Sequence, residues 1–435
     1  MVNVRIRTLW ETLSSTLWFV PGTMTVASIA LAAGTVAIDR AMTMEEAWFF
    51  LYSGGPEGAR LVLSTIAGSM ITVAGIAFST TMVALSFASS ELGPRLLRNF
   101  MRDRGNQFVL GTFIATFVYC VLVLRTVSGE PRPFVPHVGV SVGLALALAS
   151  LGVLIYFIHH AALALQADHV IGIVGRELDR SIDHLYPGGM GEEAAPARIH
   201  EYEGCEAGLR ADDAVSVALD VSGYVHAVDV EALMKLATKH DLLVRILCRP
   251  GRYVHDGLPV AEIRPATAAD DGVRGKVRAA LIVGGTRTSH QDIEFAIHQL
   301  VEVAARALSP GVNDPFTAIT CIDRLTTAIL HLMRCDFPSR FRVDGEGRLR
   351  VIADRPDFRG LADAAFHQIR QSGANLPAVT IHLLSSLTLL LEQARSEEHR
   401  RAIARHVELV RRAGVRESDE PSDRADVNER AAAAR

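Results

Sequence analysis

The chain has 435 residues, a net charge of −4 and 49% hydrophobic residues, and only 21% of its residues are charged, against about 25% in a typical soluble domain. This composition excludes a disordered chain and a basic protein that binds nucleic acid through its charge. The apolar residues concentrate in the first 165 positions, which predicts a membrane domain followed by a large soluble part.

Four uncharged runs mark the membrane domain, which we place at residues 1–160. Each run can supply the roughly 20 apolar residues that cross a bilayer. The predicted transmembrane helices cover about 15–38, 61–90, 106–126 and 137–159. The uncharged runs themselves, 12–38, 61–90, 105–124 and 133–167, contain no Asp, Glu, Lys or Arg, and pumps and carriers usually need such groups near the midplane. A passive pore or an anchored sensor or scaffold is therefore favoured.

Arginines set the predicted orientation. Arg5 and Arg7 precede the first span, and the loop after the second span carries a cluster of basic residues, Arg95, Arg98, Arg102 and Arg104. The positive-inside rule then places the N-terminus and this loop in the cytoplasm, and four spans return the C-terminal region to the same side. The cluster has two interpretations, as anchors beside anionic lipid or as the cytoplasmic mouth of a pore.

The second span carries hydroxyl side chains at helical spacing. Steps of four and three residues place them on one stripe, with Ile76 and Val83 filling the gaps. Such a stripe favours close packing between helices, or the lining of a water-filled path in an oligomer, where hydroxyls replace part of an ion's hydration. The sequence does not decide between these two interpretations, and both can be true in a ring of subunits. The pore-lining candidates are Thr65, Ser69, Thr72, Ser79, Ser86 and Ser90.

The cytoplasmic part is predicted to be α+β. Its pattern gives a connecting helix, a loop rich in Gly and Pro, a small α+β subdomain, a helical domain with a hairpin near 341–352, and a charged tail predicted to be disordered. These segments are 161–186, 187–212, 213–285, 286–415 and 416–435, respectively.

Polar residues in the helical domain form the candidate ligand or gating site. Asp314 precedes a proline, which is typical of a helix N-cap followed by Pro at the first helical position. The alternative is that several of these residues gather into one polar site, although spacing alone does not show that they converge. The candidates are Arg287, Gln291, Asp292, Arg306, Asn313 and Asp314.

The sequence carries no recognised motif for catalysis, metal binding or a cofactor. No two of the five cysteines lie at CxxC spacing, so neither a disulfide framework nor a structural zinc site is predicted. No nucleophile elbow or HExxH motif is present. We therefore expect no metal, no cofactor and no enzymatic activity. The alternative to be weighed is a hydrolase that uses Asp292 or Asp314 as base, with His290 or His298 nearby.

Four segments carry a resemblance to a known family. They are GSMITVAGIAFSTTMVALSFASSELGPRLLRNFMRD at 68–103, FIHH at 157–160, SGYVHAVD at 222–229 and RTSHQDIEFAIHQLVEVAARALSPGVNDPFTAITCIDRL at 287–325. The chain resembles the bacterial predicted membrane proteins called domain of unknown function 2254. The resemblance implies a multi-pass protein of the bacterial inner membrane with a cytoplasmic domain, and it brings no established activity. It singles out Ser309–Ala318 and residues 287–292.

Together these patterns predict an α-helical membrane protein with four transmembrane helices and a cytoplasmic α+β domain. The first functional hypothesis is a homo-oligomeric ion channel lined by the second span and gated by the cytoplasmic domain. The second is a non-conducting scaffold or sensor that binds a partner or small ligand through that domain. Expected partners are membrane lipid, further copies of the chain, and ions or a small cytoplasmic ligand, but no nucleic acid.

Overall fold

The computed structural model describes residues 18–41, 52–91, 93, 103–129, 134–164, 166–186, 202–203, 213–289 and 291–434. The chain divides into two compact units, Met1–His169 and Val170–Arg435.

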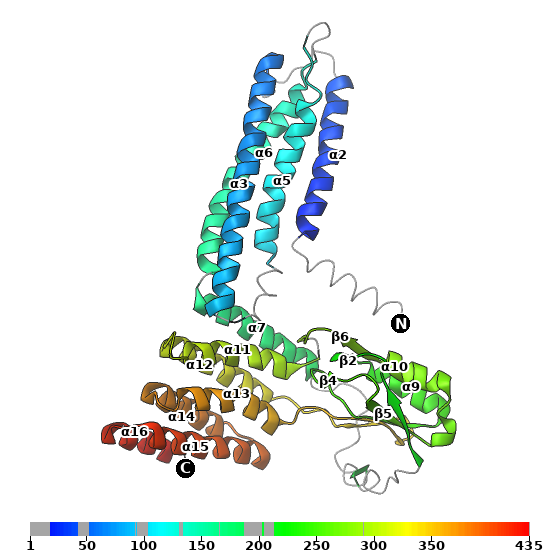
Figure 1. Ribbon diagram of the computed structural model, residues 1–435, viewed down its shortest axis with the longest axis vertical. Coiled ribbons are helices and arrows are strands. Elements are labelled where there is room, and N and C mark those ends of the chain that lie inside the picture. Colours follow the sequence, from blue (N-terminus) through cyan, green and yellow to red (C-terminus); the bar gives the residue numbers. More distant parts are fainter. Residues whose placement is uncertain are drawn as a thin grey trace. The chain divides into compact units, whose positions relative to one another are not determined.

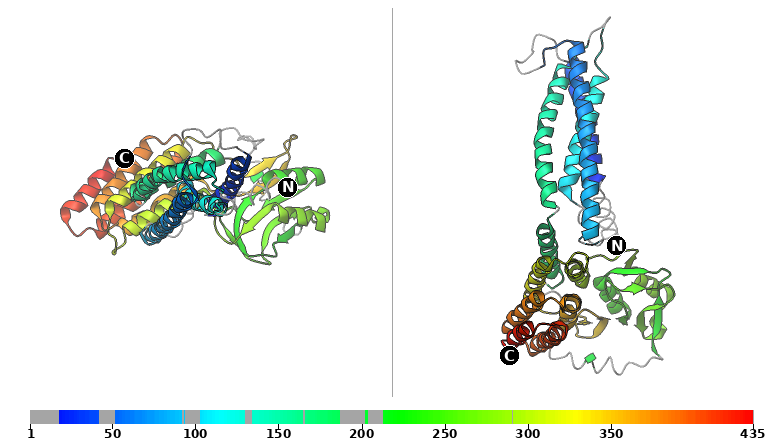
Figure 2. Two further views of the ribbon diagram at one scale, coloured as in Figure 1. Left: turned by 90° about the horizontal axis from the view of Figure 1, so that it is seen from above. Right: turned by 60° about the vertical axis from the view of Figure 1, so that its left-hand side comes forward.

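The first unit consists of four long helices that run alongside one another (Figures 1 and 2). They are α2 (Phe19–Ala41), α3 (Pro56–Glu91), α5 (Arg104–Leu124) and α6 (His137–Ala164). All four are long and apolar enough to cross a membrane, which confirms the predicted number of spans. Half of the apolar window of α5 is buried, against 22% in each of the others. Helix α5 contacts α2, α3 and α6, so it forms the centre of the bundle.

Polar groups inside the bundle pair between helices. The hydroxyl of Tyr119 on α5 lies 3.0 Å from Thr35 Oγ1 on α2 and donates to the carbonyl oxygen of Gly139 on α6 at 3.0 Å. Near the same end, Asp39 accepts hydrogen bonds from the backbone N–H groups of Val138 and Gly139 at 2.8 and 2.9 Å. A carboxylate at the N-terminus of α6 is stabilising because the helix dipole is positive there.

The second unit contains an α/β subdomain that has one apolar core between two sheets and two helices. One sheet has three strands in the order β4-β2-β6, and the other has five in the order β1-β5-β3-β8-β7. Helices α9 (Val230–His240) and α10 (Asp271–Ala279) contact the strands. The strands are β1 (Val215–Ala218), β2 (Gly223–Val228), β3 (Leu243–Ile246), β4 (Tyr253–Val254), β5 (Pro259–Arg264), β6 (Leu281–Gly284), β7 (Phe341–Val343) and β8 (Leu349–Ala353).

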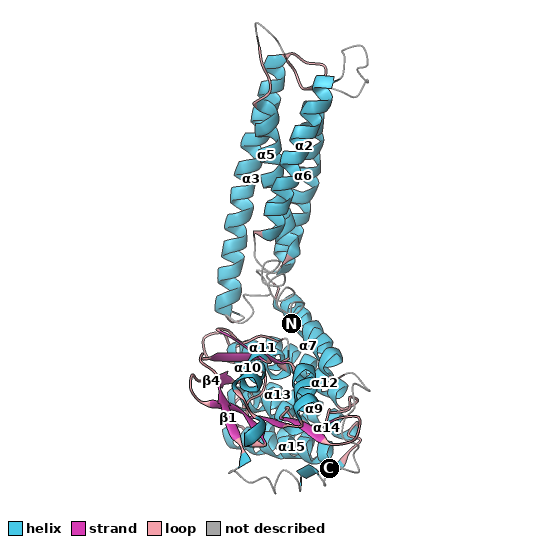
Figure 3. Ribbon diagram, turned by 90° about the vertical axis from the view of Figure 1, so that its right-hand side faces the viewer, coloured by secondary structure: helices cyan, strands magenta, loops and turns pink. Residues whose placement is uncertain are grey.

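The hairpin of β7 and β8 joins a sheet whose other strands come from much earlier in the sequence. The sequence predicted this hairpin and its turn, but assigned it to the helical segment 286–415. In the structure β8 pairs in parallel with β3, with Val351 opposite Val244. Parallel neighbours need a long connection, and here it includes α10 and β6 of the subdomain and the helices α11 and α12. The hairpin is therefore part of the β subdomain, whose strands are drawn in magenta in Figure 3.

The remaining helices of the second unit lie in successive layers (Figure 1). Contacts run from α11 to α12 and α13, from α12 to α14, from α13 to α15, and from α14 and α15 to α16. Their bounds are α7 (Ala167–Leu185), α11 (Ile293–Ala307), α12 (Pro315–Leu332), α13 (Phe358–Gly373), α14 (Pro377–Glu392), α15 (Glu397–Glu417) and α16 (Pro421–Ala432).

Two segments differ from the sequence prediction. The connecting helix 161–186 is divided, since α6 ends at Ala164 and α7 begins at Ala167. The tail 416–435, predicted to be disordered, contains α16, whose Val427 is fully buried and whose Ala431 is 3% exposed. Two apolar contacts on a highly charged helix were too weak a pattern to predict it. The loop 187–212 lies outside the described residues, except for residues 202 and 203.

Candidate functional site

The hydroxyl stripe of α3 lies on an exposed face of the helix. Thr65, Ser69, Thr72, Ser79 and Ser86 are all exposed, and Ile76 and Val83 between them are 60% and 67% exposed. The side chain of Ser90 lies outside the described part of the chain. The opposite face packs inside the bundle through Ala59, Leu63, Ala74 and Ala77. Within one chain, therefore, the stripe does not serve to pack α3 against its neighbours.

Several hydroxyls of this face bond to their own helix. Thr65, Ser69 and Thr72 donate to the carbonyl oxygen four residues earlier, at 2.7, 2.8 and 2.8 Å. Each hydroxyl oxygen keeps lone pairs that can still accept a hydrogen bond or contact a cation. The stripe is thus compatible with lipid, with a neighbouring helix or with water.

The predicted cytoplasmic mouth lies outside the described residues, since Arg95, Arg98 and Arg102 have no described position. The structure resumes with Asp103, which caps α5 by accepting a hydrogen bond from the N–H of Gly105 at 2.9 Å. The second Asp103 oxygen lies 2.5 Å from Nε2 of His160 on α6. This pair joins the ends of α5 and α6, beside the end of the arginine-rich loop.

Three of the predicted ligand or gating residues lie at the start of α11. Asp292 is 3% exposed, caps the helix, and accepts two hydrogen bonds from Arg287 at 2.5 and 3.0 Å. Gln291 accepts a hydrogen bond from the N–H of Val228 on β2 at 2.9 Å. In the first turn of α11, Glu294 accepts a hydrogen bond from Arg249 at 2.8 Å. These contacts fasten α11 to the β subdomain.

Gly251 allows this arrangement because it leaves room for the Asp292 carboxylate. Its φ of +85° is left-handed, and a Cβ at this position would lie 2.0 Å from Oδ2 of Asp292. Glycine alone meets both demands without cost. The turn at Pro250-Gly251 therefore contributes to the polar cluster around Asp292.

Asn313 and Asp314 lie at the other end of α11, before α12. Asp314 accepts hydrogen bonds from the N–H groups of Phe316 and Thr317, both at 3.1 Å, and from the Thr317 hydroxyl at 2.6 Å. The hydrogen bond from that hydroxyl is the largest cause that lowers the pKa of Asp314. Asn313 has a φ of 48°, a left-handed conformation that asparagine tolerates better than most residues. The predicted N-cap role of Asp314 is confirmed.

The six predicted residues thus lie in two groups. Arg287, Gln291 and Asp292 are at the start of α11, whereas Arg306 is in its last turn and Asn313-Asp314 follows it. Since α11 has 15 residues, its ends are about 22 Å apart. A single site that contains all six residues is not what the structure shows.

The arrangement of these residues does not support the hydrolase alternative. The carboxylates of Asp292 and Asp314 are each engaged by a helix N-terminus and a further donor. His290 lies outside the described residues, and His298 belongs to α11.

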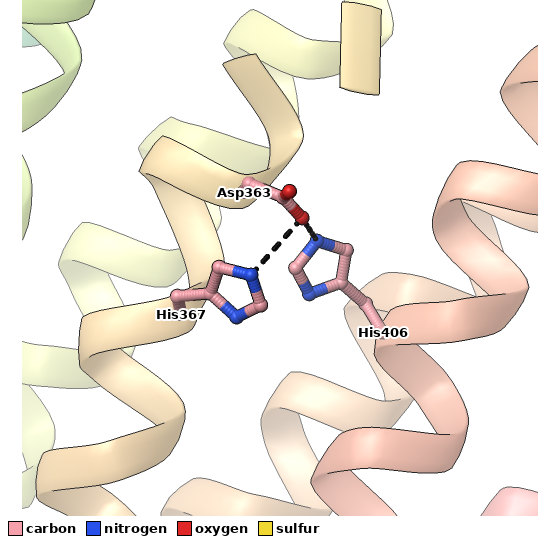
Figure 4. Close-up of side chains that lie close together, drawn as sticks. All are labelled: Asp363, His367 and His406. Atoms are coloured by element: carbon pink, nitrogen blue, oxygen red, sulfur yellow. Dashed lines mark ion pairs between the residues drawn. The ribbon is translucent and has the colours of Figure 1, made fainter. Parts of the chain in front are cut away.

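A third group of side chains was not singled out from the sequence. Asp363 and His367 on α13 and His406 on α15 point toward one another, as Figure 4 shows. Their ligand-type atoms all lie within 4.8 Å of one another. The i, i+4 spacing of Asp363 and His367 was the available signal, but a third member on another helix cannot be found by local spacing.

Comparisons with known proteins agree with the membrane character of the first unit. Residues 14–388 match the family model described as predicted membrane protein DUF2254, and the chain belongs to this family. An uncharacterized protein of Mycobacterium bovis and one of Mycobacterium tuberculosis are each 33% identical over 436 residues, covering 98% of this chain and 81% of the relative. No solved structure matches the chain.

Proposed function

We propose that this member of the family is a homo-oligomeric ion channel of the bacterial inner membrane. In this proposal α3 of each subunit lines the path, the loop with Arg95, Arg98 and Arg102 forms the cytoplasmic mouth, and the second unit gates conduction from the cytoplasm. Both termini are then cytoplasmic. The protein has no catalytic role in this scheme.

The observation that carries the proposal is the exposure of the α3 hydroxyl stripe. Five hydroxyl side chains on one stripe, interrupted only by Ile76 and Val83, face outward from the bundle. The opposite, apolar face of the same helix is the one that is buried inside. A helix that only meets lipid gains nothing from this pattern, because lipid tails do not hydrogen-bond. Exposed hydroxyls can instead form hydrogen bonds with a second copy of α3 or with water in a pore.

The small residues beside the stripe support an assembly of subunits. A Cβ at Gly68 or Gly75 would meet no atom within 4 Å among the described residues, so neither glycine is needed for packing inside one chain. Glycine at the surface of a membrane helix allows the backbone of another helix to approach closely. Subunits could therefore contact one another beside the stripe while the hydroxyls face the axis.

Ion flux from liposomes that contain the purified full-length protein tests the proposal. Ser79→Leu and Ser86→Leu should reduce flux, because each adds an apolar side chain to a narrow polar path. Ala149→Leu is a matched control, since Ala149 is a small exposed residue of α6 and has no part in the path. Its flux should equal that of the unchanged protein.

Oligomeric mass, measured on the same samples, separates conduction from assembly. Reduced flux from an intact oligomer supports the pore. A loss of the oligomer would instead mean that the stripe packs subunits together. The absence of flux across salts, voltages and pH from a folded oligomer would contradict the channel.

The second candidate is a non-conducting scaffold or sensor that binds a partner or small ligand through the second unit. Two exposed apolar side chains beside the Asp314 cap favour it, since Phe316 is 78% exposed and Val312 is 44% exposed. Phe316→Ser should then weaken capture of a partner while leaving flux unchanged. In a channel without such a partner, the substitution should affect neither.

A further inference from the structure

We propose that Asp363, His367 and His406 form a binding site for a divalent transition-metal ion of the zinc class, which links α13 to α15. The inference is independent of the proposed channel. It rests on the distances among the three side chains, on their burial and on the nature of their donor atoms.

The distances match the size of a tetrahedral site. Nε2 of His367 and Nε2 of His406 lie 3.1 and 2.9 Å from the same oxygen, Oδ1 of Asp363. Metal–ligand bonds of about 2.0 Å in a tetrahedron place neighbouring ligand atoms about 3.3 Å apart. The third edge, between the two ring nitrogens, is no longer than 4.8 Å, so rotation of the side chains can bring all three atoms to the spacing that an ion needs.

The helices hold the ligands in place before any ion arrives. Asp363 and His367 are four residues apart on α13, so both project from one face of the helix. The same spacing carries paired ligands in helical zinc motifs. His406 projects from α15 toward them (Figure 4), and its ring packs against Phe366 with 5.7 Å between ring centroids.

A buried and unsatisfied histidine is the second, independent observation. The His406 side chain is 1% exposed, and its Nδ1 has no hydrogen-bond partner among the described residues, while its Nε2 meets the Asp363 carboxylate at 2.9 Å. Nδ1 of His367 also lacks one. Buried polar atoms without partners are rare and costly. A metal ion would satisfy one nitrogen of each ring.

Protonation also suits metal binding, since a histidine must be neutral to bind a metal ion. Burial is the largest cause that lowers the pKa of His367, and it lowers the pKa of His406 to about 4. The neighbouring Arg405 contributes in the same direction in both cases, whereas Asp363 opposes it. Both rings are therefore neutral near pH 7, with a lone pair available.

The donor set indicates the class of ion. Two imidazole nitrogens and one carboxylate oxygen suit zinc and the neighbouring divalent transition metals, whereas magnesium and calcium prefer oxygen ligands. Three protein ligands leave a fourth position for water. The ring nitrogens that face away from the ion lack the acceptor that usually orients a ligating histidine, and such partners typically add about 10–100-fold in affinity. We therefore expect moderate affinity.

Arg405 is the competing partner of Asp363. Its Nη1 lies 2.9 and 3.2 Å from the two carboxylate oxygens, and its side chain is 41% exposed. The guanidinium can therefore move into solvent when an ion takes its place. Without metal, the same contacts form a polar bridge between α13 and α15, and this bridge is the structural alternative that the experiment must separate.

Zinc titration of the tag-free, full-length protein in detergent tests the site, after removal of metals with a chelator. We expect one Zn²⁺ per chain, an increase in melting temperature with Zn²⁺, and no response to Mg²⁺. Replacement by Co²⁺ should give the absorption bands of a tetrahedral site. His367→Gln should weaken Zn²⁺ binding by at least ~10-fold while the melting temperature without metal stays near that of the unchanged protein, because His367 is partly exposed.

A matched control is His399→Gln, which replaces a histidine on α15 two turns before His406 and outside the cluster. It should leave Zn²⁺ affinity unchanged. Arg405→Gln should strengthen binding several-fold, because the competing cation is gone. The proposal is overturned if the unchanged protein binds no Zn²⁺, if His399→Gln and His367→Gln weaken binding equally, or if Arg405→Gln weakens binding.

Discussion

The two units of the chain contrast most clearly between the exposed polar face of α3 and the buried charged bridges of the second unit. On the exposed face of α3, Thr65, Ser69 and Thr72 donate hydrogen bonds to their own helix. In the second unit, charged groups such as Arg350 and Asp292 are almost fully buried, and Arg350 bridges its hairpin to Asp241 and Leu242, which lie more than 100 residues earlier. Polar groups of the first kind leave a helix face available for other contacts. Those of the second kind fix how elements of the fold are arranged.

This difference indicates which substitutions can report on function and which report only on folding. Removing a bridge in the second unit should unfold part of the structure, so a loss of activity there says little about chemistry. Removing a self-bonded hydroxyl on α3 should barely affect folding of the single chain. A functional effect of such a change would therefore report on another subunit or on the path itself.

The largest expected effect comes from the buried ion pair of the β7–β8 hairpin. Asp344 accepts a hydrogen bond from Nε of Arg350 at 2.8 Å, and the two side chains are 6% and 5% exposed. Asp344→Ala leaves the buried guanidinium with Asp241 as its remaining carboxylate partner, at 2.8 Å, so the free energy of unfolding should fall by roughly 3 kcal/mol, the lower end of the range for a broken buried pair. Hydrogen exchange of the hairpin in the full-length protein measures this loss.

Asp354→Ala is the matched control on the same hairpin, because the Arg340–Asp354 pair is 42% and 61% exposed. Surface pairs contribute only about 0–1 kcal/mol. Equal effects of the two substitutions would contradict the view that buried bridges hold this unit together.

The same pair predicts a pH dependence. Burial alone would raise the pKa of Asp344, but hydrogen bonds from the N–H of Arg348 and from Arg350 outweigh it and hold the pKa well below its usual range. A depressed pKa means that the contribution to stability is complete above the unfolded value of about 4 and is lost as the pH falls below it. Asp344→Asn should flatten that acid limb of the stability curve.

An intermediate effect is expected at the turn beside Asp292. Gly251→Ala should cost roughly 1–2 kcal/mol for the left-handed conformation, and more because the new Cβ would displace the Asp292 carboxylate. Gly257→Ala is the control, since its φ of +74° is similar and a Cβ there meets nothing within 4 Å among the described residues. Chemical denaturation followed by circular dichroism measures both, and equal losses would show that the Asp292 contact adds nothing.

The smallest effects are expected inside the membrane unit. Thr116 is 1% exposed, and its hydroxyl lies 3.2 Å from that of Ser150 on another helix, so Thr116→Val should cost about 0.6 kcal/mol. Thr72→Val should cost less, because Thr72 bonds only to its own backbone in the described structure. Unfolding in mixed detergent micelles compares them. A larger loss for Thr72→Val would indicate a partner outside the single chain, and would break the contrast between the two units.

The sequence by itself determined the features that depend on local composition. Runs of about 20 apolar residues predict membrane helices because the bilayer demands them wherever they lie in the fold. The cap at Asp314 and the β7–β8 hairpin followed from neighbouring residues. The spacing of the hydroxyl residues also predicted that they lie on one stripe of α3, but only the structure shows that this stripe is exposed.

Tertiary structure alone decided which distant segments meet. The parallel pairing of β8 with β3 and the convergence of His406 with Asp363 and His367 join residues whose spacing along the chain carries no periodic signal. The tail helix α16 is held by Val427 and Ala431, too few apolar residues to predict a helix. The six polar candidates lie at opposite ends of α11, because the length of that helix, which local spacing did not take into account, separates them. Local patterns fix which face a residue occupies, whereas packing of whole elements fixes what that face touches.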